Sequence, residues 1–142
     1  MKTLITLFFL GFFILGANES RAQIFQYKND IIKELGTPDD TGVSDDGADY
    51  IVYEKDLNTK ASGEYTRHKV IYFEEMEDGQ QICNMWRILE PSSETNSFVS
   101  YFKDNFVEVE YMQWKDYETE ILYDVSVKED VCIVTAVYDT RK

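Results

Sequence analysis

The stretch Val131-Cys132-Ile133-Val134-Thr135-Ala136-Val137-Tyr138 has the composition of a β-strand from the middle of a sheet. Its central residues are apolar at consecutive positions, so both faces of such a strand would be buried. The polar turn Lys128-Glu129-Asp130 separates it from the segment before it. A sheet built around residues 131–138 is therefore expected, with the rest of the chain arranged on either side.

Five further strands and two helices are predicted from periodicity and from turn residues. The strands are expected at 50–55, 67–75, 81–89, 107–114 and 117–126, and the helices at 24–35 and 94–106. Short turns such as Glu77-Asp78-Gly79 imply antiparallel pairing. The predicted fold class is α+β, a single antiparallel sheet of about six strands with two helices on one face. Its element order would be α-β-β-β-α-β-β-β, which has the form of a diverged duplication.

Each predicted helix carries one apolar stripe. Ile24, Tyr27, Ile31 and Leu35 recur at helical spacing, and Gly36 and Pro38 end that segment. In the second helix Phe98, Phe102 and Phe106 lie four residues apart, which is typical of an amphipathic helix packed on a sheet.

Residues 1–22 have the layout of a secretory signal peptide. A basic start at Lys2 precedes an apolar run, and small residues stand three and one positions before a cut between Ala22 and Gln23. The apolar run is shorter than a membrane-spanning helix needs; an uncleaved membrane anchor is the alternative, and Ala17 offers a second cleavage position. We expect residues 23–142 to form a single exported domain, periplasmic or extracellular, with no membrane span after cleavage.

The chain is strongly acidic, with a formal net charge of −13 at pH 7. This charge repels phosphate backbones and disfavours nucleic-acid binding. It is compatible with a cationic protein partner, and equally with solubility alone.

Acidic residues alternate with apolar ones at 107–126. A loop at residues 115–117 would pair Tyr111 with Ile121 and Val109 with Tyr123, which collects the apolar side chains on one face. The opposite face would then be acidic, with Asp124 and Leu122 on it. Candidate partner-binding residues on that face are Glu108, Glu110, Met112, Trp114, Glu118 and Glu120. Trp114 is the residue that most favours a contact surface, because tryptophan is enriched at interface centres; a merely solvated face is the alternative.

Few residues have the spacing of a catalytic or metal site. Cys83 and Cys132 lie in predicted strands, where a disulfide and two buried free thiols are both compatible with the sequence. His68 is the only histidine, and a cleft beside it would be required for a small hydrolase or an enzyme inhibitor. The aspartate-rich loop 37–49 does not match an EF-hand. No metal and no cofactor is predicted.

The segment Leu35-Gly36-Thr37-Pro38, followed by an acidic loop and the strand Asp49-Tyr50-Ile51-Val52-Tyr53, resembles small exported helix-plus-sheet domains. It is similar to those of the outer-membrane assembly lipoproteins and of the β-lactamase inhibitor protein-like fold. The resemblance covers about 30 residues and implies a binding or scaffold role. The chain departs from that pattern in lacking the lipid-bearing cysteine and in having one leading helix where two are usual, so no functional residue carries over.

The sequence therefore predicts an exported, non-enzymatic binding or accessory protein that uses an acidic sheet face. The alternative is the hydrolase or inhibitor with a cleft near His68.

Overall fold

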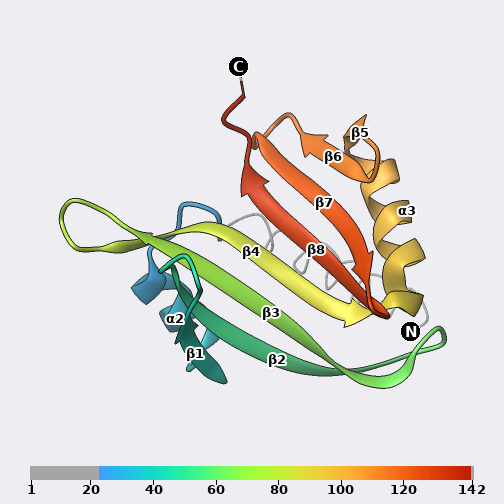
Figure 1. Ribbon diagram of the computed structural model, residues 1–142, viewed down its shortest axis with the longest axis horizontal. Helices are drawn as coiled ribbons and strands as arrows, with labels where there is room; N and C mark the ends of the chain where they lie inside the picture. Colours follow the sequence, from blue (N-terminus) through green and yellow to red (C-terminus); the bar gives the residue numbers. More distant parts are fainter. Residues whose placement is uncertain (1–22, 142) are drawn as a thin grey trace, which may run out of the picture.

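The computed structural model describes residues 23–141, and the predicted signal peptide 1–22 lies outside that range. Within it one antiparallel sheet is accompanied by two short helices (Figure 1). The elements are α2 (Lys28–Leu35), β1 (Asp40–Val43), β2 (Asp49–Thr59), β3 (Gly63–Glu75), β4 (Gln81–Pro91), the 3-10 turn η1 (Ser92–Glu94), α3 (Thr95–Asn105), β5 (Val107–Glu110), β6 (Gln113–Asp116), β7 (Ile121–Lys128) and β8 (Val131–Tyr138). Among these residues no helix is both long and apolar enough to cross a bilayer.

The chain consists of two halves of the same topology. Each half is a helix followed by a four-stranded meander, and the sheet order is β1-β2-β3-β4-β8-β7-β6-β5. The halves join along their last strands, β4 and β8, with Ile88 opposite Val134. The strand predicted at 131–138 thus lies at the centre of the sheet, and the duplicated organisation has four strands in each half.

The prediction of about six strands is wrong, because the sheet has eight. One additional strand, β1, forms inside the acidic loop and pairs with the start of β2. Its Gly42 lies opposite Tyr50, and a Cβ atom at that position would collide with the Tyr50 ring. The other additional strand arises because residues 107–114 do not run as one strand but turn at Tyr111 and Met112 to give β5 and β6.

One face of the sheet is buried under both helices. A row of paired residues crosses it from β2 to β6 and contributes large side chains at nearly every strand: Ile51, Ile71, Trp86, Ala136, Tyr123 and Trp114. Ile31 of α2 and Phe102 of α3 belong to the same buried cluster. The Tyr53 hydroxyl also donates to the Gly36 carbonyl, 2.8 Å away, at the end of α2.

The aromatic residues of α3 form the densest part of this core. The Phe102 ring lies 5.0 Å from the Tyr123 ring and 5.5 Å from the Trp114 ring, centroid to centroid. Phe98 and Phe106 continue the stack along the helix. The predicted stripe therefore does face the sheet, as its four-residue spacing requires.

The two cysteines are free buried thiols. Cys83 pairs with Phe73 near one end of β4, whereas Cys132 lies opposite Glu90 near the other end. Seven residues of strand separate them along β4, a distance of roughly 20 Å. A disulfide needs its two Cα atoms about 6 Å apart, so this fold leaves Cys83 and Cys132 unbridged.

Neither thiol is expected to react with an aromatic disulfide reagent while the protein is folded. Burial raises the pKa of Cys83 to about 12 and raises that of Cys132 as well, and the thiolate is the reactive form. Two thiols should titrate after unfolding in urea. Finding none in the unfolded, unreduced protein would show a disulfide and contradict this arrangement.

Candidate functional site

The register of β6 and β7 differs from the predicted one. Trp114 pairs with Tyr123 and Asp116 with Ile121, and the connection runs through residues 117–120. The predicted pairing of Tyr111 with Ile121 is therefore wrong. The turn at Met112, which has a positive φ of 58°, reverses the chain, and Trp114 then faces the core with 1% of its surface exposed.

The candidate partner-binding residues do not form one face. Glu108 and Glu110 lie on the edge strand β5, Glu118 and Glu120 in the β6–β7 connection, and Met112 packs against the core. Trp114, which most favoured a contact surface, stacks on Phe102 and cannot reach a partner. Burial of the large indole decides the register here, because the apolar side chain stabilises the fold only when it faces inward.

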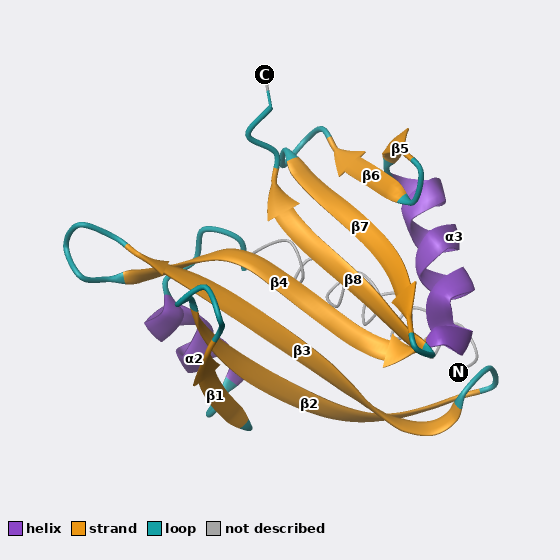
Figure 2. Ribbon diagram, in the orientation of Figure 1, coloured by secondary structure: helices purple, strands orange, loops and turns teal. Residues whose placement is uncertain are grey.

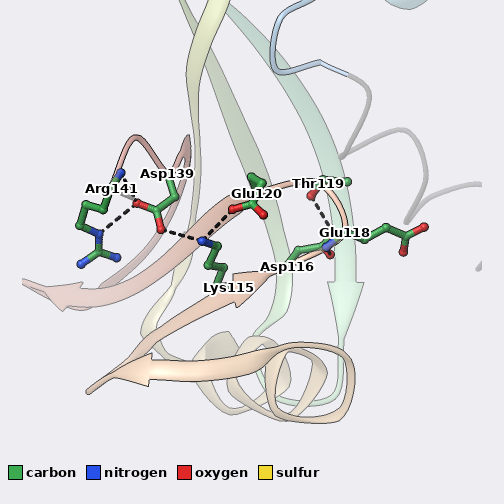
Figure 3. Close-up of polar contacts among 7 residues, drawn as sticks. All are labelled: Lys115, Asp116, Glu118, Thr119, Glu120, Asp139 and Arg141. Atoms are coloured by element: carbon green, nitrogen blue, oxygen red, sulfur yellow. Dashed lines mark hydrogen bonds and ion pairs between the residues drawn. The ribbon is translucent and has the colours of Figure 1, made fainter.

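Two of these glutamates, Glu120 and Glu110, are used within the molecule, and Figure 3 shows the contact of Glu120. The Lys115 ammonium lies 2.7 Å from Glu120 and 3.0 Å from Asp139, and it is mostly buried. Arg141 contacts Asp139 at 3.0 Å and Glu110 at 3.4 Å. The hydrogen bonds from Arg141 and Lys115 hold the pKa of Asp139 at about 2. This network fastens the C-terminal segment to the β6–β7 connection.

His68 lies on β3, with its side chain 45% exposed and 3.4 Å from the Glu54 carboxylate on β2. It faces away from the helices, whereas both cysteines are buried in the core on the helix side. Hollows of about 300 and 540 Å³ lie at the start of α2 and along the β2–β3 hairpin, and His68 lines neither. Both thiols thus lie on the opposite side of the sheet from His68, and neither of these two hollows lies beside it.

A cluster that sequence reasoning missed joins the end of the β2–β3 hairpin to the start of α3 through side-chain hydrogen bonds; Figure 1 shows the ribbons of these two segments near each other. Glu94 is buried and accepts hydrogen bonds from Thr59 and from Ser62, the latter at 2.8 Å. Glu90 is also buried and forms an ion pair with Arg67. Burial and the nearby Glu90 raise the pKa of Tyr65 to about 12. Both carboxylates have hydrogen-bond or ion-pair partners within the protein. The cluster is therefore a structural contact between the β2–β3 hairpin and the start of α3.

The remaining candidate is the sheet face opposite the helices, here called the outer face. In Figure 2 no helix lies in front of β3, β4, β8 and β7. Most of its residues are half-buried, and apolar side chains surround a polar middle row. The outer face consists of Val70, Tyr72, Met85, Arg87, Leu89, Gln113, Leu122, Asp124, Ile133, Thr135 and Val137.

No protein-family model, curated protein or solved structure matches the chain. Its function must therefore be inferred from its own geometry. The outer face combines apolar side chains with polar groups that have no hydrogen-bond partner among the described residues: the Arg87 Nε and Gln113 Oε1 atoms are buried without a hydrogen bond. Such groups are costly unless a ligand or a partner satisfies them.

Proposed function

We propose that the chain is an exported, non-enzymatic binding protein whose outer face binds a cationic protein. The observation that carries the proposal is the apolar character of a sheet face that no helix of the described residues covers. In an antiparallel sheet with one open face, polar residues normally point to that face and alternate along each strand with apolar residues that face the core. Here Val70, Met85, Leu89, Ile133 and Val137 point to that side instead.

Apolar patches of this kind on a folded domain mark interaction sites. Charge supports a basic partner, because the chain has a net charge of −13. The same side of the sheet carries Glu54 and Glu64 on β2 and β3 beside the apolar rows. Acidic residues around an apolar centre attract a cationic surface and repel an acidic one.

Export remains part of the proposal and rests on the sequence of residues 1–22. The helix-side residues are less suited to binding, because Phe102, Trp114 and Tyr123 are committed to the core. The buried Glu90 and Glu94 are likewise committed to internal contacts. The outer face is the surface that these internal contacts leave available.

The proposal is tested by site-specific photo-crosslinking in the organism that makes the protein. A photoreactive residue at Val70 or Ile133 reports on the outer face, and one at the exposed Lys60 of the β2–β3 turn is the matched control. We expect the photoreactive residues at Val70 and at Ile133 to crosslink to the same protein, and we expect that protein to be basic. About 1 M salt should suppress this crosslinked product, because salt screens the attraction between opposite charges. Equal crosslinking from Lys60, or an acidic protein as the product, would contradict the proposal.

A further inference from the structure

Two polar residues of the outer face lie directly opposite each other at its β6–β7 end. Gln113 pairs with Asp124, and Asp124 pairs in turn with Thr135 of β8. Directly opposed residues on one face of an antiparallel pair have Cβ atoms about 5 Å apart. The side chains of Gln113 and Asp124 are therefore close enough to contact one ligand group together.

Both residues present hydrogen-bond acceptors. The Gln113 Oε1 atom is buried and has no hydrogen-bond partner. Asp124 is half-buried, and burial alone raises the pKa of its carboxyl. A carboxylate in such a place ordinarily has an opposite charge or hydrogen-bond donors beside it. Within residues 23–141 no ion pair is formed by Asp124.

The nearest cations of the face are directed elsewhere. Lys115, two residues from Gln113 on β6, is held by Glu120 and Asp139. Arg87 is two strands away from Asp124, about 10 Å across the sheet, and its guanidinium lies 5.6 Å from the Tyr72 ring centre. Neither cation compensates the Asp124 charge, so the face has a local excess of acceptors.

Resting on the proposed function, we infer that Asp124 and Gln113 form the subsite that receives an arginine side chain of the cationic partner. A guanidinium is planar and donates several hydrogen bonds in fixed directions, so that it can satisfy the carboxylate and the amide oxygen together. A lysine ammonium would contact the same acceptors as a point charge and bind less tightly. The half-buried Val137 beside the subsite would pack against the aliphatic stem of the arginine.

The test uses a fluorescent hexa-arginine amide peptide and the exported form of the protein, with binding followed by anisotropy. Asp124→Asn should weaken binding about tenfold or more, because a charge-assisted hydrogen bond contributes that much to affinity. Gln113→Met removes only the amide and should weaken binding severalfold. Glu118→Gln is the matched control: it removes the same charge from an exposed residue of the β6–β7 connection and should change affinity less than about twofold.

Hydrogen exchange of the wild-type protein with the peptide separates the two proposals. If the peptide protects Val70 and Ile133 but Asp124→Asn binds it as well as Glu118→Gln does, the arginine subsite is wrong and the outer face remains the binding surface. If the peptide leaves the outer face unprotected, both are wrong. Should Asp124→Asn fail to fold, Gln113→Met decides the matter, and wild-type affinity in that variant overturns the subsite. Equal affinity for a hexa-lysine peptide would contradict the preference for arginine.

Discussion

Replacing Phe102 by alanine is expected to lower the free energy of unfolding by about 3–5 kcal/mol. The Phe102 ring is 4% exposed and lies between the Trp114 and Tyr123 rings on one side and its own helix on the other. Removing it leaves a cavity at the seam between α3 and the sheet, and the rigid aromatic neighbours cannot collapse into that space. Urea denaturation followed by tryptophan fluorescence measures the loss.

Phe98→Ala is the matched control for this substitution. Phe98 lies one turn earlier on α3, is only half-buried and stacks on Phe102 at 6.4 Å. Its removal should cost about 1–2 kcal/mol, because less apolar surface returns to water. An equal cost for the two substitutions would mean that α3 is not seated on β6 and β7 as described.

Replacing Arg67 by methionine is expected to destabilise the fold by about 2–3 kcal/mol. The substitution keeps the apolar stem but leaves the Glu90 carboxylate, whose side chain is 1% exposed, without its ion-pair partner. Breaking a buried pair in this way is more costly than losing a surface pair. The value lies at the low end for buried pairs, because 34% of the Arg67 side chain is exposed and water can reach that side.

Lys55→Met provides the control, because Lys55 is exposed and lies directly opposite Arg67 on β2. It should change the unfolding free energy by less than about 0.5 kcal/mol. Thermal unfolding of both variants at neutral pH makes the comparison. If Lys55→Met lowered the unfolding free energy as much as Arg67→Met does, the loss in Arg67→Met could not be attributed to its ion pair with Glu90.

The parts of the fold that follow from local patterns were predictable. The strand at 131–138 has the predicted bounds and the predicted central place in the sheet. The expected burial of both its faces is wrong, because Cys132, Val134 and Ala136 are buried on the helix side whereas Ile133 and Val137 are half-buried on the outer face. The Phe98, Phe102 and Phe106 stripe faces the sheet. The first helix begins four residues later than predicted, at Lys28, because residues 25–27 pair with β4 instead.

The strand count was not predictable from the same patterns. The turn between β5 and β6 uses Tyr111 and Met112, which carry none of the glycine, asparagine or proline signals of a turn. Met112 adopts a left-handed φ of 58°, which is unfavourable for a residue other than glycine, and burial of Trp114 two residues later helps to offset that cost. Once the chain turns there, the alternation of residues 107–112 no longer predicts which face Trp114 and Asp116 take.

Among the residues considered for function, some were likewise predictable from local sequence patterns and others were not. Asp124 was correctly expected to point away from the helices, because its neighbours Tyr123 and Val125 are apolar and buried. The roles of Glu90 and Glu94 could not be recognised among 27 acidic residues, since only long-range pairing brings the β2–β3 hairpin to them. The outer face itself depends on the register of five strands, β3, β4, β8, β7 and β6, which no single segment encodes.

Hydroxyl-radical oxidation of two methionines tests the role of the outer face most directly. Met85 lies in the middle of that face, and Met76 lies in the β3–β4 turn with 43% of its surface exposed. With the crosslinked basic partner bound, Met85 should become protected from oxidation while Met76 reacts as in the free protein. Protection of Met76 with Met85 unchanged would place the partner elsewhere and contradict binding through the outer face.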